Sequence, residues 1–190
     1  FTIPIVLFNP PPPGYSFVHI KHDTSVISSL LTYLSDKDYT SIAHIAGDQR
    51  TIVGRLSLKY FIHFMRSHNL PLREKWIIES DFTQKGGYEA MKTLLTLEEK
   101  PRAVWAANDL MAIGAMEAIK ESDLSIPEDI AVAGYDDIEY ASIVTPKLTT
   151  VYKPKYELGS IATGLLINLI KGERVETVSL KDKLIIRESA

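Results

Sequence analysis

The sequence predicts an α/β fold in which a parallel sheet is flanked by helices. Short apolar runs rich in β-branched residues, typical of strands covered on both faces, alternate with longer segments of helical periodicity. The two kinds of segment recur about every 30 residues, which is the spacing of right-handed βαβ units on a parallel sheet. Clusters of polar residues follow several apolar runs, at the strand ends where open parallel sheets bind ligands.

The composition sets limits on the class of protein. The chain has 190 residues, of which 45% are hydrophobic and 24% charged, as in an ordinary globular protein. Its formal net charge of -3 argues against a nucleic-acid surface spread over the chain. The absence of cysteine excludes disulfides and thiolate sites, and it agrees with a cytoplasmic location. No apolar run has the length of a membrane span, and no signal peptide opens the sequence.

The first residues already have the character of a buried strand. Because Phe1 rather than Met opens the chain, we expect a fragment of a longer protein. Ile3–Phe8 is an apolar, β-branched strand segment. Asn9 follows it, and Pro10–Pro13 then favours stiff polyproline II geometry. This proline segment is either a connector between two lobes or a surface loop, and the residues alone leave both open.

The alternation of strands and helices continues to the end of the chain. A capping Thr24 or Ser25 precedes a helix that reaches Asp36. Its apolar stripe is Val26, Ile27, Leu30, Leu31 and Leu34. The other expected strands are 17–20, 41–46, 76–79, 103–107, 130–133, 148–152, 175–180 and 184–187. The other expected helices are 54–68, 86–97, 110–121 and 155–170. Their inward residues are expected to be Leu56, Tyr60, Phe64 and Met65, then Tyr88, Met91 and Leu95, and last Leu158, Ile161, Ala162, Leu165 and Leu169.

The helix expected over Leu110–Glu121 is apolar nearly all round. Only Glu117, Lys120 and Glu121 carry a charge, whereas a helix on one face of a sheet needs only one apolar stripe. The surplus favours a second buried contact, for which we prefer a subunit interface. The alternative is a helix sandwiched within a single chain.

No catalytic or metal-binding pattern stands out. The sequence lacks the GxSxG, HExxH and GK[ST] motifs, so nothing supports an enzyme. His19 and His22 surround a strand end and would not converge on a metal, and His63 and His68 lack helical ligand spacing. His44 alternates with apolar residues, which is typical of a core histidine. We expect no catalytic residue, no cofactor and no metal.

Polar residues that follow strands form the candidate site. Each has a local explanation as a helix cap or turn, but together they would line one edge of the sheet. Asp136 can accept hydrogen bonds from two adjacent hydroxyls, Arg55 offers a fork of donors, and Asn108 can donate and accept. Phe82 can cover the C–H face of a sugar ring or belong to the core. The set is Asn9, Asp48–Thr51, Asp81–Phe82, Asn108–Asp109 and Asp136–Asp137.

Three stretches carry a family resemblance. AANDLMAIGAMEAI (106–119), IPEDIAVAGYDD (126–137) and TPKLTTVYKPKYELG (145–159) resemble the sensor domain of LacI/GalR-type transcriptional regulators. The match extends through IAGDQRTIVGR (45–55), DFTQKGGYEAM (81–91) and IPIVLFNPPPPG (3–14). The resemblance implies a periplasmic-binding-protein-like (type I) fold. Residues 17–150 would form a complete C-terminal lobe, and residues 1–16 and 151–190 the crossings and parts of the N-terminal lobe.

The resemblance also implies roles for particular residues. The ligand contacts would be Asn9, Thr51, Arg55, Phe82, Asn108, Asp136 and Lys153. The contacts of a homodimer would be Ile113, Ile143 and Val144. The function implied is effector sensing in a repressor, which would bind a small sugar or sugar derivative and pass lobe closure to a DNA-binding headpiece. That headpiece, which would contact operator DNA, would lie outside this chain. The alternative is a periplasmic sugar-binding protein of a transport system, which shares the fold.

Two positions depart from the common family pattern. Asn9 stands where sugar-responsive members often have Asp, and Lys153 stands where Gln is frequent. The first change removes a negative charge and the second adds a positive one, so the pocket becomes more positive. We therefore expect an anionic effector, such as a sugar phosphate or a sugar acid.

Overall fold

The computed structural model describes residues 3–11 and 14–190. Phe1, Thr2 and Pro12–Pro13 of the proline segment lie outside the described residues. The chain forms two compact units, and the second comprises Val26–Tyr152 and Leu184–Ala190. The first comprises the residues up to Ser25 together with Lys153–Lys183. The lobe boundaries expected from the sequence remain a prediction, and each unit is described by itself.

A four-stranded parallel sheet forms the centre of the second unit. Its strand order is β4-β3-β5-β6. The strands are β3 (Ile42–Ala46), β4 (Ile77–Glu79), β5 (Ala103–Ala106) and β6 (Ala131–Ala133). In the register, His44 lies beside Ile77 on one side and Trp105 on the other. These are the four central strands expected from the sequence, and β4 begins one residue late because Glu74–Trp76 is a 3-10 helix.

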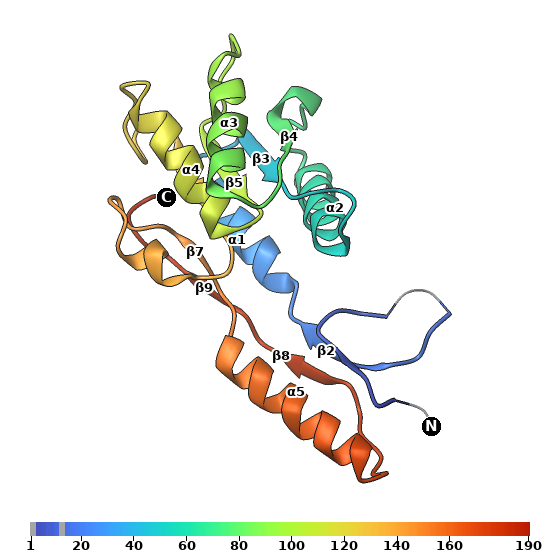
Figure 1. The fold of residues 1–190 in the computed structure, drawn as a ribbon. Coiled ribbons are helices and arrows are strands. Elements are labelled where there is room, and N and C mark those ends of the chain that lie inside the picture. The colour runs from blue at the N-terminus through green and yellow to red at the C-terminus, as the bar shows by residue number, and fades with distance from the viewer. Residues whose placement is uncertain (1–2, 12–13) are drawn as a thin grey trace. The chain divides into compact units, whose positions relative to one another are not determined.

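Helices cover both faces of this sheet, as Figure 1 shows for the second unit. They are α1 (Ser25–Asp36), α2 (Ile52–Ser67), α3 (Gln84–Leu95) and α4 (Asp109–Lys120). The core with α1 and α2 contains Leu30, Phe61 and Trp105, whereas the core with α3 and α4 contains Met91 and Val104. Trp105 and Val104 are neighbours in β5 and point to opposite faces, as strand geometry requires.

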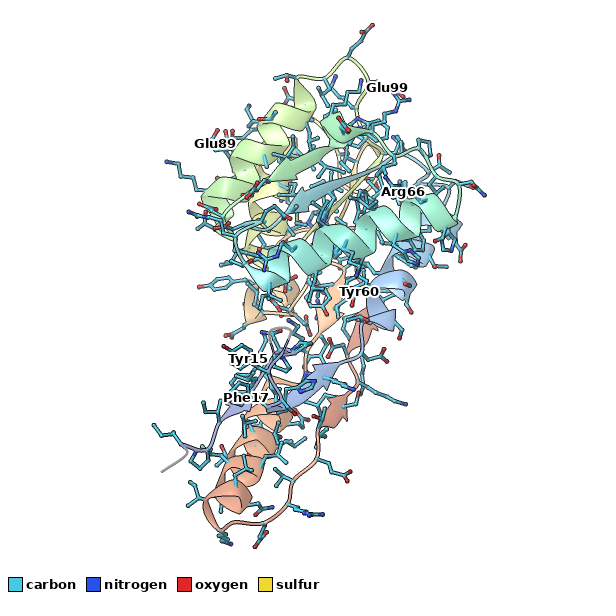
Figure 2. The ribbon with its side chains drawn as sticks, turned by 90° about the vertical axis from the view of Figure 1, so that its right-hand side faces the viewer. Tyr15, Phe17, Tyr60, Arg66, Glu89 and Glu99 are labelled. Atoms are coloured by element: carbon cyan, nitrogen blue, oxygen red, sulfur yellow. The ribbon has the colours of Figure 1, made fainter. Side chains whose placement is uncertain are left out.

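The apolar spacing identified the buried side of α1 correctly but that of α2 only in part. All five residues expected to face inward in α1 are buried. In α2, Phe64 and Met65 are buried as expected, whereas Tyr60 is only partly buried and Phe61 is buried in its place. Figure 2 shows Tyr60 and Arg66 along α2, and Glu89 on α3. The side of α2 that faces the core is therefore rotated from the one that the spacing indicated.

The helices α3 and α4 are in close contact with each other. A Cβ added to Gly87 would lie 2.2 Å from Met111 O, and one added to Gly114 would lie 1.9 Å from Gln84 O. Only glycine allows the two backbones to approach so closely. Part of the apolar surplus of α4 is thus covered within the chain, although Leu110 keeps 41% of its surface exposed.

The last residues of the chain complete the second unit. The strands β7 (Thr150–Tyr152) and β9 (Lys183–Ile185) pair with each other. Beyond β9, Ser189 O accepts a hydrogen bond from Val132 N at 2.8 Å. At the chain end, Tyr33 Oη donates to Ala190 O at 2.6 Å.

The first unit contains a smaller parallel sheet and one helix. The strands β1 (Val6–Leu7), β2 (Val18–His22) and β8 (Val178–Leu180) have the order β1-β2-β8. The helix α5 (Lys155–Ile170) has the bounds expected from the sequence, but none of its residues is buried. The rings of Tyr15 and Phe17, labelled in Figure 2, are stacked with their centroids 5.9 Å apart. Among the described residues, no helix is long and apolar enough to cross a membrane.

Candidate functional site

The carboxyl ends of the four parallel strands define one edge of the second unit. From β3 the chain proceeds through α2 to β4 on one side, whereas from β5 it proceeds through α4 to β6 on the other. The direction therefore reverses between β3 and β5, and open α/β sheets bind ligands in the crevice at such a point. Five of the seven expected ligand contacts lie in the segments that follow these strands: Thr51, Arg55, Phe82, Asn108 and Asp136.

The segment after β3 is held by two of the expected contacts. Thr51 caps α2, because its Oγ1 accepts a hydrogen bond from Gly54 N at 3.0 Å. The same hydroxyl donates to Asp48 O at 2.7 Å. Nη1 of the exposed Arg55 donates to two carbonyl oxygens of this segment, at 3.0 Å from each. Arg55 has two further nitrogens with donors, so it can hold the loop and still bind an oxygen-rich ligand.

Phe82 and Asn108 connect the ends of β4 and β5. Asn108 caps α4 by accepting from Met111 N at 2.9 Å, and its Nδ2 donates to Phe82 O at 2.9 Å. Phe82 has a φ of 65°, and its ring lies so close to Gly47 that an added Cβ there would be 1.9 Å from the ring. The partly buried ring also packs against the core. Both residues thus have structural roles at the edge where ligand binding is expected.

The segment after β6 is a turn with an unusual backbone. Asp136 and Asp137 have φ values of 112° and 48°, a region that L residues adopt rarely. Such conformations cost about 1–3 kcal/mol each and persist where the surroundings enforce them. One restraint is the hydrogen bond from Asp136 N to Val151 O, at 2.9 Å. A second is the ion pair between Arg187 Nη2 and Asp137 Oδ1 at 2.8 Å, in which both side chains are only 17% exposed.

Asp109, which the sequence analysis placed among the strand-end polar residues and interpreted as a possible helix cap, is a buried carboxylate beside this turn. Its side chain is 0% exposed. The carboxylate accepts hydrogen bonds from Thr150 Oγ1 and from Ile138 N, the latter at 2.8 Å. The pKa of Asp109 is raised to about 6, because burial, together with the charges of Asp136 and Asp137, outweighs the two hydrogen bonds, which lower it. The signal that could have identified it is an acidic residue at the start of an otherwise apolar helix.

A separate cavity of about 510 Å³ opens at the outer edge of β4. Its lining includes Asp48, Glu79, Asp81 and Glu89. The hydrogen bonds and charge of Arg50 lower the pKa of Asp48 to about 2. None of the seven expected ligand contacts lines this cavity.

The two remaining expected ligand contacts belong to the first unit. Asn9 is exposed and follows β1 closely, and Lys153 is partly buried and comes directly after β7.

Within the part of the chain that the structure describes, no group of three or more His, Asp or Glu residues is arranged to hold a metal ion. His44, in contrast, is fully buried in the core, as expected, and bonds through Nδ1 with Trp105 O at 2.9 Å.

The residues expected at a dimer interface lie in the second unit around α4. Ile143 is 62% exposed, and nearby Tyr140 is 63% exposed. Ile113 and Val144 are partly buried against the core of the α3 and α4 face. A hydrogen bond from Lys120 Nζ to Thr145 O joins α4 to the segment that carries Tyr140 and Ile143.

Comparison with known proteins identifies relatives over nearly the whole chain. Residues 31–190 match the family model described as a periplasmic binding protein-like domain. The ribose operon repressor of Escherichia coli (strain K12) is 39% identical over 170 residues, which cover 89% of this chain and 52% of the repressor. The chain thus spans about half the length of the curated relatives it matches.

Two solved structures have the same fold. A regulatory protein of the LacI family from Chloroflexus aggregans has a TM-score of 0.91 and 31% identity, covering 98% of this chain and 68% of that one. The transcriptional regulator CelR, solved in complex with cellobiose, has a TM-score of 0.86 and 30% identity. That match covers 97% of this chain and 57% of CelR.

Proposed function

Because this chain belongs to the LacI family and to the periplasmic binding protein-like domain family, we propose that it is the effector-sensing domain of a DNA-binding transcriptional repressor. The observation that carries the proposal is the placement of five polar or aromatic residues along the carboxyl edge of a parallel sheet, around its switch point. The similarity to repressors and regulators favours gene regulation over sugar transport. In the full-length protein, effector binding would change how a DNA-binding headpiece fits its operator.

The effector that these residues suit is a sugar or sugar derivative. Asp136, Asn108 and Arg55 together offer acceptors and donors for several hydroxyl groups. The relatives include a repressor named for the ribose operon and a regulator solved with cellobiose. We propose a sugar phosphate or a sugar acid, because Asn9 replaces a common acidic residue and Lys153 adds a cation.

Calorimetric titration of the full-length protein tests the effector class. D-ribose and D-ribose 5-phosphate form a matched pair of probes that differ in the phosphate. We expect tighter binding of the phosphate, and we expect Lys153→Gln to weaken that binding about tenfold or more, because a charge-assisted hydrogen bond is lost. Lys155→Gln, which changes an exposed lysine two residues away, is the control and should change affinity less than twofold. Binding of ribose and other neutral sugars, with none of anionic sugars, would contradict the anionic effector.

We also propose that the protein forms a homodimer through the apolar surface around α4. This surface consists of Leu110, Ile113, Tyr140, Ile143 and Val144. Three of the five side chains are more than 40% exposed, so the second unit leaves them without full cover. Burying them against a second copy would remove this apolar surface from water.

Sedimentation of two aspartate variants tests the dimer. Ile113→Asp and Ile143→Asp would each place an unpaired charge in the interface and should produce monomers. Ile143→Asp is the cleaner variant, because a side chain that is 62% exposed can be replaced without unfolding the subunit. Ile170→Asp changes an isoleucine of α5 that is 67% exposed and serves as the control. An unchanged dimer mass for Ile143→Asp would show that the interface lies elsewhere.

A further inference from the structure

The turn that carries Asp136 is attached to the first residue of α4 at both of its ends. Asp109 N donates to Tyr135 O at 2.9 Å, at the start of the turn. The carboxylate of Asp109 accepts from Ile138 N at 2.8 Å, at its end. Between these two bonds lie Asp136 and Asp137, which have positive φ values although neither is a glycine. A single buried residue thus closes the turn over its two unfavourable residues, with its backbone N–H at one end and its carboxylate at the other.

Two further neighbours fix the position of this carboxylate. Thr150, the first residue of β7, is fully buried and donates its hydroxyl hydrogen to Asp109 Oδ1. On another side, a Cβ added to Gly134 would lie only 2.2 Å from Asp109 Oδ1. The carboxylate therefore lies against the backbone just before the turn, and close packing on this side restricts its position.

We propose that Asp109 is a positioning residue, which holds the Tyr135–Ile138 turn closed so that Asp136 is presented to the effector. The ligand role of Asp136 rests on the proposed function, whereas the hold on the turn does not. Asp109 itself is fully buried, so its role in the proposal is to act through the turn and not by contact with the effector. Because it is also the first residue of α4, it joins the effector-binding turn directly to the helix of the proposed dimer surface.

The charges around Asp109 make its burial unfavourable and so favour a role other than stability. The neighbouring charged groups are Asp136 and Asp137 of the turn, together with Arg187, which pairs with Asp137. Two carboxylates therefore repel Asp109, and Arg187 is paired with Asp137 rather than with Asp109. The raised pKa of Asp109 reflects this burial and repulsion. A carboxylate that is buried beside like charges commonly serves a function, because stability alone would favour a neutral residue at this position.

Two substitutions separate the hydrogen bonds from the charge. Asp109→Ala removes both acceptors and should release the turn. Asp109→Asn keeps an oxygen for Ile138 N and places an amide donor beside the Thr150 hydroxyl, which can rotate to accept. The asparagine variant should therefore restore what the alanine variant loses. Asp123→Asn is the matched control, because this exposed residue lies just beyond the other end of α4 and also has a positive φ, of 57°.

The first measurement needs no effector. Amide hydrogen exchange of the full-length protein should show that Asp109→Ala lowers the protection of Ile138 N at least tenfold. The amides of Val104 and Met91 in the core should change less than twofold, and Asp109→Asn should keep Ile138 protected. General destabilisation would instead lower the protection of all three amides. If Ile138 stays protected in Asp109→Ala, or if the core amides lose protection equally, the proposal is wrong.

The second measurement uses D-ribose and D-ribose 5-phosphate as probes in calorimetry. Asp109→Ala should lower the affinity for whichever probe the parent protein binds by at least tenfold. The affinities of Asp109→Asn and Asp123→Asn should stay within about threefold of that of the parent protein. Equal affinity in the parent and Asp109→Ala would overturn the positioning role. If the parent binds neither probe, that result counts against ribose-type effectors in the proposed function, and the exchange data still decide the role of Asp109.

Discussion

The two units contrast in how fully they bury the apolar stripes that the sequence gives their helices. In the second unit, α1 buries all five residues of its stripe, and both faces of the sheet have a core. In the first unit, α5 has an equally regular stripe but no buried residue. Periodicity alone therefore predicts a helix and its apolar side, whereas burial depends on a partner surface that the helix itself does not supply.

The contrast predicts that a core leucine of the second unit is highly sensitive to truncation. Leu94 of α3 is 0% exposed. Leu94→Ala should lower the free energy of unfolding by about 4 kcal/mol, because it removes apolar contacts and leaves a cavity. Urea unfolding followed by tryptophan fluorescence measures this unit selectively, since both tryptophans, Trp76 and Trp105, are buried in it. A loss below about 1 kcal/mol would show that the core of this unit is not closely packed.

The second unit also contains a buried histidine whose titration should oppose folding in acid. His44 is stacked between Phe61 and Trp105, and burial lowers its pKa from 6.5 to about 4. The neutral form favours the folded state, so the contribution of His44 to stability is complete above pH 6.5. It is lost as the pH falls toward 4, and the loss amounts to about 3 kcal/mol. His44→Phe keeps a ring in the stack and removes this loss.

The buried Asp109 should act in the opposite direction over nearly the same range. Its pKa is raised from 3.8 to about 6, so its contribution to stability is greatest below pH 3.8 and falls as the pH rises through 6. The change is again about 3 kcal/mol. Between pH 4 and 6, the contributions of His44 and Asp109 to the pH dependence of the free energy of unfolding nearly cancel in the parent protein. Relative to the parent, His44→Phe should gain stability as the pH falls, and Asp109→Asn should lose it. Urea unfolding at pH 4, 5 and 6 measures the free energy of unfolding of the parent and both variants. The same pH dependence in all three proteins would contradict both predictions.

The sequence predicted the local parts of this structure better than the parts that depend on distant residues. The stripe of α1 and the bounds of α5 follow from helical spacing within one segment. The buried side of α2 was only partly correct, because α2 packs against α1 and the sheet together, and its own residues do not determine that contact. Local reasoning therefore works where one segment contains all the information.

Prediction of the candidate site from the sequence was limited in the same way. Its strand-end residues were found because polar clusters after apolar runs are visible in the sequence. The role of Asp109 was missed, because its partners Ile138 and Thr150 lie 29 and 41 positions away. The pairing of Asp137 with Arg187 was missed for the same reason. A carboxylate that caps a helix and one that closes a distant turn have the same sequence signature, and only the fold distinguishes them.

The smallest change in the free energy of unfolding is expected for a substitution in the first unit. Leu165 lies on the stripe of α5 but is only partly buried. Leu165→Ala should therefore cost less than about 1 kcal/mol in this chain, because little apolar contact is lost. Circular dichroism at 222 nm reports the helix, whereas tryptophan fluorescence should not change, since both tryptophans belong to the second unit. The chain spans about half the length of the curated relatives it matches, and we expect the region that only the relatives contain to supply the partner for α5. The same substitution in the full-length protein should then cost about 3 kcal/mol. Equal small losses in the two proteins would show that α5 keeps an uncovered stripe in both, and the contrast between the units would then belong to the family fold itself.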